Sequence, residues 1–298
     1  MRAAAILGLG CSAKDLRPFQ TDSAIEWRMG VPAADDHVEV ILLFGGDGTI
    51  HRHLGQLVKL GLPVLVVPAG SGNDFARSLN LRSVWDSRAA WDRFRADAGN
   101  VRRIDLGIIT ETSSESSRYS VLETRYFACV AGIGLDGEVA RRANKLPRWL
   151  RGHGGYVLSL APTIFAFAPL PMKISTPDAQ ATSGASWVTR SEQPTLLAAF
   201  ANAPQFGGGM KIAPQAKMDD GLLDVCIVRA VSRLKLLSVF PTVYAGRHLG
   251  IREVEYFKAE RVRVETERPL DVYADGEYVC RTPVEISVQR AALKVVTL

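Results

Sequence analysis

The hydrophobic pattern divides the chain into two parts that differ in texture. Over roughly the first hundred residues, continuous apolar runs alternate with stretches in which apolar residues recur every three or four positions. The runs are typical of strands buried on both faces of a parallel sheet, and the spaced pattern is typical of helices. The strands are predicted at Ala3–Leu9, Val38–Phe44 and Val64–Val67, and the helices at Ile50–Leu60, Phe75–Leu79 and Val84–Ala98.

Alternating strands and helices in the first part predict a three-layer α/β domain with right-handed crossovers. From Val101 onwards the apolar runs are short and many are separated by turn residues, which predicts a β-rich second domain. We expect helices in it at Leu135–Ala143, Tyr156–Phe167 and Leu234–Arg247, and polar loops at Thr110–Arg118 and Ala179–Ser186. Its strands are expected at Ile104–Ile109, Tyr126–Val130, Thr195–Asn202, Leu222–Val228, Arg261–Val264, Asp271–Ala274, Val279–Arg281, Val284–Val288 and Leu293–Val296.

The composition fits a globular protein of the cytoplasm. With 298 residues, 47% of them hydrophobic and 22% charged, the chain is long enough for two domains and a sizeable core. The four cysteines form no CxxC pair and no Cys/His cluster with zinc spacing, so we expect reduced, buried thiols. The net charge of +5 is a weak indication of an anionic membrane surface or substrate. The sequence has no basic stretch interleaved with aromatic residues, which is the pattern that would indicate nucleic-acid binding.

Two apolar segments raise the question of membrane insertion. The N-terminal run is short and is better explained as a first strand than as a signal peptide. Tyr156–Met172 contains three prolines and is short for a spanning helix. The sequence does not distinguish between a core helix and an interfacial helix for this segment.

The sequence GGDGT, Gly45 to Thr49, joins a predicted buried strand to a predicted helix. Glycines at such a junction let a ligand approach the backbone, and the free N–H groups at the helix start favour an anion. A carboxylate there, that of Asp47, can orient a metal ion or a water beside phosphates. Tight packing alone explains many such turns, so this motif is a weak signal by itself.

A second glycine-rich junction, Gly70–Asp74 in PAGSGNDFAR, follows the next predicted strand. Because turns after consecutive parallel strands lie at the same edge of a sheet, we expect both junctions to face one cleft. Two acids, two hydroxyls and several amides would then converge, as in sites for phosphate and magnesium. The chain has no GxxxxGK[ST], so the site is not a P-loop. Farther along, Asp275-Gly276 between strand-like flanks predicts a tight hairpin.

Six motifs follow one another along the chain: FGGDGT, PAGSGNDFAR, RIDLG, FACVAGIGLDGEV, FGGGMKIAPQAKMDDGLLD and YADGEYV. In this order they resemble the diacylglycerol kinase catalytic-domain family, and most closely its bacterial, soluble lipid-kinase branch. The resemblance covers nearly the whole chain. GGDGT is shared with NAD kinases, which belong to the same superfamily, whereas GSGNDFAR is the segment that indicates lipid kinases.

The resemblance implies two domains. Residues 1–106 would form the α/β nucleotide-binding domain, joined by the C-terminal segment 290–298, and residues 107–289 would form a β-sandwich that binds the lipid. ATP and Mg²⁺ are the implied cofactors. We expect a cytoplasmic protein of phospholipid biosynthesis that contacts the anionic inner face of the membrane peripherally, and a homodimer is compatible with this.

The resemblance also assigns roles to residues. Glu277 would be the general base for the lipid hydroxyl, and Asp275 would help to place it; by pattern alone Glu277 would be an ordinary solvated side chain. Asp47, Asp74 and Asp105 would form an aspartate–water–magnesium network, and Asp220 is a weak further metal candidate. The residues expected at the ATP phosphates are Gly45, Gly46, Asp47, Gly48, Thr49, Gly70, Ser71, which stands where the family usually has threonine, and Asn73.

Three departures from the family pattern stand out. GLGCS, Gly8 to Ser12, replaces the usual asparagine–proline loop after the first strand. After GGDGT the usual asparagine and glutamate are replaced by His51 and Arg52. His51 and His53 could indicate a metal site, but residues two apart on a helix face different ways, so we expect a solvated first turn there. Lys217 stands where the structural magnesium site near Asp220 normally has an acid, so we expect that site to be lost, with the Lys217 ammonium in its place.

The sequence thus predicts an ATP-dependent lipid kinase that transfers the γ-phosphate to a lipid hydroxyl such as that of diacylglycerol. An NAD kinase is one alternative, and GSGNDFAR and the β-rich DGE segment speak against it. A non-catalytic lipid- or nucleotide-binding protein is another. The shortened N-terminus and Lys217 leave that alternative open, whereas Asp47, Asp74 and Glu277 speak against it.

Overall fold

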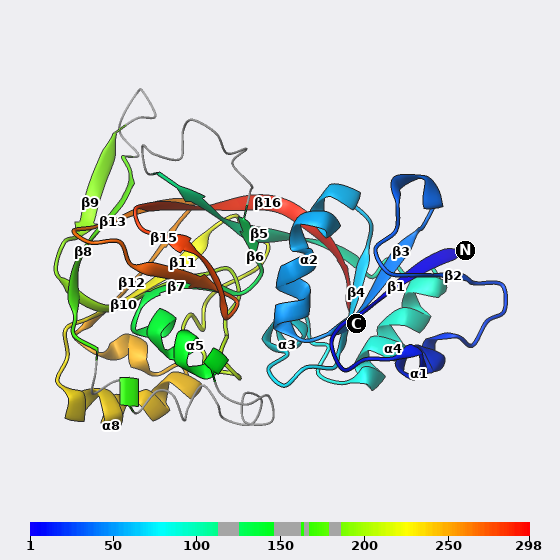
Figure 1. The fold of residues 1–298 in the computed structure, drawn as a ribbon, viewed down its shortest axis with the longest axis horizontal. Coiled ribbons are helices and arrows are strands. Elements are labelled where there is room, and N and C mark those ends of the chain that lie inside the picture. Colours follow the sequence, from blue (N-terminus) through cyan, green and yellow to red (C-terminus); the bar gives the residue numbers. More distant parts are fainter. Residues whose placement is uncertain (113–124, 146–161, 164–166, 179–185) are drawn as a thin grey trace.

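The computed structural model describes residues 1–112, 125–145, 162–163, 167–178 and 186–298. Its N-terminal part is built on a parallel sheet (Figure 1). The strands lie in the order β2 (Glu26–Met29), β1 (Arg2–Leu7), β3 (Val40–Gly45) and β4 (Val64–Pro68). The helices of this part are α1 (Ala13–Leu16), α2 (Asp47–Leu60), α3 (Asp74–Ser78) and α4 (Val84–Arg95), with short 3₁₀ helices η1 (Arg17–Phe19) and η2 (Ala34–Asp36).

Local sequence explains where these elements begin and end. Every residue of β3 and β4 is buried, as the continuous apolar runs predict. Helix α2 ends at Gly61, which takes the left-handed conformation (φ 62°) that glycine adopts without strain. Helix α4 begins at a capping box in which Ser83 and Asp86 satisfy each other's backbone amides.

The C-terminal part is a sandwich of two mainly antiparallel sheets around a buried core that includes Phe127, Ile174, Phe200, Val264 and Ile286. The two sheets meet at a short pairing between β8 and β10. One sheet contains β9 (Trp187–Ser191), β8 (Leu170–Pro177), β13 (Arg261–Thr266), β16 (Val284–Val296), β5 (Val101–Glu111) and β6 (Arg125–Phe127). The other contains β12 (Val254–Ala259), β11 (Leu223–Arg229), β10 (Pro194–Ala201), β7 (Val130–Gly134), β14 (Asp271–Ala274) and β15 (Glu277–Arg281).

Two long strands, β5 and β16, join the two parts. They pair with each other in antiparallel fashion along most of their length, and Val295 near the end of β16 lies parallel to Val64 of β4. Figure 1 shows β16 running from the sandwich back to the N-terminal part. Because both strands cross from one part to the other, a domain boundary at residue 106 stays a prediction.

The predicted fold class, α/β plus a β-sandwich, is confirmed. Two details of the strand prediction are wrong. The expected strand Tyr126–Val130 is split between β6 and β7, and the last two expected strands are one strand, β16, whose register is irregular between Gln289 and Leu293. The sequence pattern also missed β2, β8, β9 and β12. All four cysteines are unpaired, and all but Cys11 are buried.

The described residues of the C-terminal part include the helical segments α5 (Leu135–Lys145) and α8 (Arg233–Tyr244) and the 3₁₀ helix η3 (His248–Gly250). The first two lie near their predicted positions. Most of the expected helix Tyr156–Phe167 and of the two expected polar loops lies outside the described residues. Within the described ranges, none of the helices combines the length and the apolar character needed to cross a bilayer.

Gly107 in β5 is a steric requirement of the sandwich. It lies opposite Phe127 of β6, and a methyl group on it would fall inside the buried Phe127 ring. We therefore expect Gly107→Ala to lower the free energy of unfolding by about 2–3 kcal/mol through overpacking. Phe127→Leu should restore part of the loss, measured by urea denaturation as a double-mutant cycle.

The matched control is Gly55→Ala in α2, where an added methyl group meets nothing within 4 Å. This substitution should stabilise the protein slightly, because alanine is favoured over glycine in helix interiors by up to about 1 kcal/mol. Equal changes in the free energy of unfolding for the two substitutions would show that Phe127 does not exclude a side chain at residue 107.

Candidate active site

The two glycine-rich junctions lie directly against each other. A Cβ atom on Gly46 would be 2.9 Å from the Cα of Gly70, and one on Gly70 would collide with the Cα of Gly46. The amide of Ala69 also donates a 3.1 Å hydrogen bond to the carbonyl of Gly45. This close approach of two backbones requires glycine on both sides, and it brings the amino ends of α2 and α3 to one place.

Asp47, the first residue of α2, links the two junctions. Its Oδ1 accepts a 3.0 Å hydrogen bond from the Phe75 amide and its Oδ2 a 3.1 Å bond from the Asp74 amide. Asp47 therefore caps the start of α3 from the neighbouring junction. Burial and the nearby charge of Asp74 raise the pKa of Asp47 to about 6, against the lowering effect of the two amides.

Asp74 is the second acid at this point and is almost fully buried. It forms an ion pair with Arg77, and its Oδ2 accepts a 2.8 Å hydrogen bond from the amide of Gly208. Gly208 belongs to the C-terminal part, in a glycine-rich turn between Phe206 and Met210. The two parts of the chain therefore meet at this carboxylate.

Asp275 makes a second connection between the two parts. It begins the tight turn between β14 and β15, where Asp275 (φ 50°) and Gly276 (φ 86°) both take left-handed conformations. The Asp275 carboxylate, 2% exposed, lies 3.2 Å from His51 Nδ1 and accepts hydrogen bonds from three successive backbone amides. Those amides are Ala128 (2.8 Å), Cys129 (2.8 Å) and Val130 (3.2 Å).

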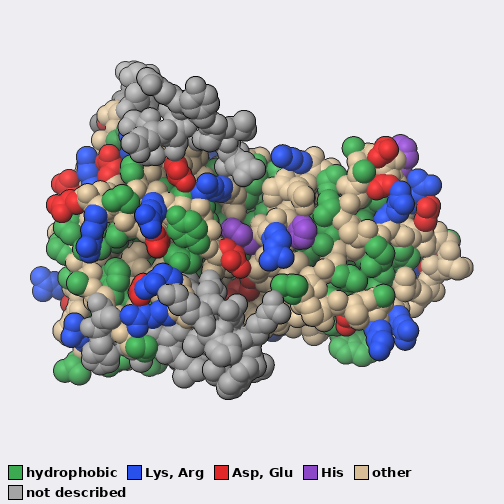
Figure 2. Space-filling view, in the orientation of Figure 1, with side chains coloured by type: hydrophobic (Ala, Val, Ile, Leu, Met, Phe, Trp, Pro, Cys, Tyr) green, Lys and Arg blue, Asp and Glu red, His purple; other side chains and the backbone are tan. Residues whose placement is uncertain are grey.

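This turn carries Glu277 to the amino end of α2. A Cβ atom on Gly48 would lie 3.0 Å from Oε1 of Glu277. Glycine at position 48 therefore leaves room for a carboxylate from a distant segment of the sequence. Figure 2 shows acidic and histidine side chains gathered where the two parts of the molecule meet.

The prediction of a solvated first turn after GGDGT is wrong for His51. Its side chain is 17% exposed and contacts Asp275, whereas His53 on the same helix pairs with Gln56. Residues two apart do face different ways, and the hairpin of the C-terminal part lies against His51. Burial lowers the pKa of His51, but the hydrogen bond to Asp275 and the charges of Asp275 and Glu277 outweigh it and raise the pKa.

The other residues expected at the nucleotide have distinct positions. The side chain of Thr49 packs against Gly8 and Gly45, whose added Cβ atoms would meet it within 3 Å. Ser71 is exposed in the second junction. Asn73 closes that junction, because its side chain exchanges hydrogen bonds of 2.9 and 2.7 Å with the backbone of Gly70.

Asp105 has different hydrogen-bond partners from Asp47 and Asp74. Its two carboxylate oxygens accept 2.7 Å bonds from the amides of Gly221 and Ala291. Asp105 thereby holds the turn before β11 and the irregularity in β16. In the described part of the chain, no three histidine, cysteine or acidic side chains converge in a way that could hold a metal ion.

The residues around Asp220 do not fit a divalent cation. The ammonium of Lys258 lies 2.7 Å from Asp220 Oδ2 and 3.4 Å from Asp224 Oδ2, so a positive charge already occupies the position that a cation would take between these acids. The prediction that Lys217 fills this position is wrong, because Lys217 is exposed. Lys258 lies opposite Asp224 in the pairing of β11 with β12, and the sequence pattern missed it because it missed β12.

The His51 contact predicts a pH-dependent contribution to stability. An imidazolium beside Asp275 stabilises the folded state fully below the ordinary histidine pKa of about 6.5, and this contribution is lost as pH rises through the raised pKa. His51→Gln should therefore lower the free energy of unfolding by about 1 kcal/mol at pH 6 and by much less at pH 9. Urea denaturation at both pH values measures the difference.

His53→Gln is the control for that measurement. His53 is on the same helix and its ring contacts Gln56 rather than an acid, so its replacement should have a small effect that does not change with pH. A loss for His51→Gln that is equal at pH 6 and pH 9 would contradict a charged contact with Asp275.

Comparison with known proteins identifies the family of the chain. The model of the diacylglycerol kinase catalytic domain matches residues 12–109, and the model of the YegS C-terminal NAD kinase beta sandwich-like domain matches residues 129–297. A diacylglycerol kinase of Mycobacterium tuberculosis is 34% identical over 257 residues, which cover 86% of this chain and 76% of the relative. A diacylglycerol kinase of Bacillus subtilis is 27% identical over 255 residues, 85% and 76% of the two chains.

Solved structures share the fold. A diacylglycerol kinase structure from Bacillus anthracis covers all of this chain and 97% of its own, with a TM-score of 0.65 at 19% identity. An NAD kinase from Archaeoglobus fulgidus in complex with ATP covers all of this chain and 93% of its own, with a TM-score of 0.51 at 14% identity. At these identities the likeness concerns the fold alone. The family models and the relatives establish that the chain belongs to the diacylglycerol kinase catalytic-domain family and is a kinase.

Proposed function

We propose that this kinase transfers the γ-phosphate of ATP to the hydroxyl group of diacylglycerol or a similar lipid. One observation carries the proposal: Glu277 of the C-terminal hairpin lies against Gly48 at the amino end of α2. This arrangement puts a carboxylate beside a helix terminus that is suited to phosphate. A phosphate site and a proton acceptor would thus be supplied by opposite parts of the chain.

The junctions 45–49 and 70–73 are the proposed phosphate site. Gly46 is the N-cap residue of α2 and has no side chain to occupy the first amides of the helix. Those amides and the positive end of the helix dipole favour an anion. The exposed hydroxyl of Ser71 in the adjoining junction would donate a further hydrogen bond.

Asp47 and Asp74 are the proposed holders of a magnesium ion bound mostly through water and phosphate oxygens, and Asp74 would share its carboxylate between that ion and Arg77. Each carboxylate repels the other, which contributes to the raised pKa of Asp47, and a cation would relieve this repulsion. Mg²⁺ keeps several waters and commonly uses one or two carboxylates with substrate phosphates. When bound, it would neutralise the charge of the phosphates. Asp105 is not included, because the partners of its carboxylate, the amides of Gly221 and Ala291, are shared with neither Asp47 nor Asp74.

Glu277 is the proposed general base. As the lipid oxygen forms its bond to the γ-phosphorus, the hydroxyl proton would move to the Glu277 carboxylate, and ADP would leave with the electrons of the broken phosphorus–oxygen bond. Asp275 would act as a positioning residue, because its hydrogen bonds fix the turn that carries Glu277. A water-insoluble acceptor is met at a membrane surface, so we also propose peripheral contact with the inner face of the membrane.

The acceptor is tested by transfer of labelled γ-phosphate from Mg·ATP to a panel of lipids in mixed micelles, with NAD in a parallel reaction. The proposal expects label on a lipid hydroxyl and none on NAD. Label on NAD alone would overturn the proposed acceptor and leave the nucleotide site standing.

Glu277→Gln should lower kcat by about 10²- to 10⁴-fold, because an amide cannot accept the hydroxyl proton. The KM for ATP should change less than about twofold, since no part of the phosphate site is removed. Steady-state kinetics with saturating lipid measure both values.

The matched control is Asp271→Asn at the start of the same hairpin, where Asp271 pairs with Arg281. It should leave kcat nearly unchanged. Comparable losses of kcat and of ATP binding in Glu277→Gln would rule out a base and indicate a structural role.

The raised pKa of Asp47 predicts a pH-dependent response to Mg²⁺. Because the folded-state pKa of about 6 lies above the ordinary value of 3.8, the stability from this group is fully present below 3.8 and is lost as pH rises through 6. A bound cation should restore it. We expect about 20 mM Mg²⁺ to raise Tm by about 2 °C at pH 7.5 and by much less at pH 5.

Two variants distinguish the two candidate positions of the cation. Asp47→Asn should abolish the response of Tm to Mg²⁺, whereas Asp220→Asn should retain it, because Lys258 already occupies the position that a cation would take there. A response that survives in Asp47→Asn and vanishes in Asp220→Asn would contradict the proposed magnesium position.

A further inference from the structure

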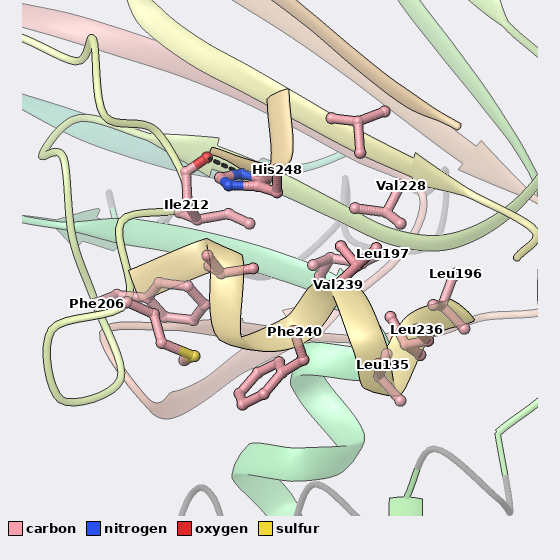
Figure 3. A pocket seen from close by; sticks show the side chains of 13 residues that line it. Leu135, Leu196, Leu197, Phe206, Ile212, Val228, Leu236, Val239, Phe240 and His248 are labelled. Atoms are coloured by element: carbon pink, nitrogen blue, oxygen red, sulfur yellow. Dashed lines mark hydrogen bonds between the residues drawn. The ribbon is translucent and has the colours of Figure 1, made fainter. Parts of the chain in front are cut away.

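An apolar pocket of about 70 Å³ lies in the C-terminal part beneath α8 (Figure 3). Four side chains of α8, spaced as one face of a helix, form one wall: Leu236, Val239, Phe240 and Val243. The rest of the wall comes from β10, β11, the start of α5, the turn around residues 206–212 and the neighbourhood of η3.

The chemistry of this pocket suits hydrocarbon. Its described lining is apolar except for His248, whose Nε2 meets the carbonyl of Ile212 at 3.1 Å. Burial lowers the pKa of His248, which favours the neutral imidazole. A charged or strongly polar ligand would lose most of its hydrogen bonds to water here, because the described lining offers one unpartnered side-chain polar atom, His248 Nδ1, whereas a hydrocarbon chain has no hydrogen bonds to lose.

The size of the pocket suits part of a chain. Its volume of about 70 Å³ is about half that of a 150 Å³ apolar cavity that is able to hold benzene. A few methylene groups would therefore fill it. A compact ligand such as a nucleotide base with its ribose is too large.

One turn connects the pocket to the acid pair of the candidate active site. Phe206 and Met210 line the pocket and form a two-residue bridge with mutual hydrogen bonds of 3.0 and 2.9 Å. Between them, the Gly208 amide donates its 2.8 Å hydrogen bond to Asp74. A molecule bound at the acid pair is therefore next to the pocket.

Helix α8 has apolar residues on two faces. The face described above lines the pocket, and Leu234, Leu237 and Tyr244, which are 80%, 39% and 37% exposed, lie on the outside. None of the residues of α8 is fully buried. A helix on a water-facing surface normally has a polar outer face, and an apolar outer face is typical of helices that meet a partner or a lipid interface.

We propose that the pocket beneath α8 receives the end of an acyl chain of the lipid acceptor. The assignment rests on the proposed lipid-kinase function, because that function supplies the acceptor. The hydroxyl group of the lipid lies at Glu277, the chain follows the turn 206–210, and its end packs against Val239 and Val243. The outer face of α8 then lies toward the lipid surface from which the chain enters.

The first test fills the pocket from α8. Val239→Trp should raise the KM for a diacylglycerol with 16-carbon chains at least fivefold and change the KM for one with 6-carbon chains less than twofold, with the KM for ATP unchanged. Ser238→Trp places the same side chain on an exposed position of the same helix and should keep the chain-length preference of the parent. A folded Val239→Trp variant with the parent's chain-length preference would overturn the assignment.

The second test needs no catalysis and no variant. A diacylglycerol with a photoreactive diazirine at the end of one 16-carbon chain is cross-linked to the full chain without ATP, and the labelled peptides are identified by mass spectrometry. Label at residues 206–212 or 236–243 supports the assignment, and label confined to other segments overturns it. Phosphoryl transfer to lipids without label in these segments would leave the kinase proposal intact. Label there without transfer to any lipid would leave the pocket assignment intact and overturn the proposed reaction.

Discussion

The geometry of the candidate site depends on the hydrogen bonds of the Asp275 carboxylate. The carboxylate accepts three successive backbone amides from the segment that joins β6 to β7 and meets His51 on α2, all within 3.2 Å. Hydrogen bonds to an ionised acceptor are stronger than neutral ones, and this carboxylate is nearly excluded from water. It therefore fixes the β14–β15 turn, and with it Glu277, relative to the amino end of α2.

A second constraint is steric and comes from glycine. Gly46 and Gly70 let the two junctions of the parallel sheet touch, and Gly48 leaves room for Glu277. The close approach also puts two acids together, and burial, with the charge of Asp74 as the second cause, raises the pKa of Asp47. Such a concentration of negative charge is unfavourable for stability by itself, and a bound cation would reduce the repulsion.

Much of the fold could be predicted from the sequence, because β3, β4 and α2 have strong and regular hydrophobic periods. The hydrophobic pattern did not predict the strands β2, β8, β9 and β12, because their sequences are mixed in polarity and their partners lie far away in the chain. The contacts of His51 and Lys258 were not predicted either, because their partners are also far away in the chain. Each pairs with an acid that is distant in sequence, and the spacing of residues along one segment carries no information about such a partner.

From the sequence, only the family resemblance assigned roles to Glu277 and Asp275, since a residue after a hairpin turn is commonly solvated. The structure gives a physical reason to consider them, because the hairpin lies against the helix terminus. The position of Asp105 shows the limit of inferring a residue's role from resemblance. Its carboxylate oxygens accept the amides of Gly221 and Ala291, away from the hydrogen bonds that link Asp47 and Asp74, and its predicted part in a metal network stays a prediction.

The central claim is that two segments far apart in the chain, residues 45–49 and 275–277, form one site for phosphoryl transfer. A crystal structure with Mg²⁺ and a non-hydrolysable ATP analogue tests it most directly. We expect the γ-phosphorus to lie at the first amides of α2, with the Glu277 carboxylate facing it across a gap that a hydroxyl group can enter. A triphosphate bound elsewhere, or a Glu277 side chain turned away from it, would contradict the claim.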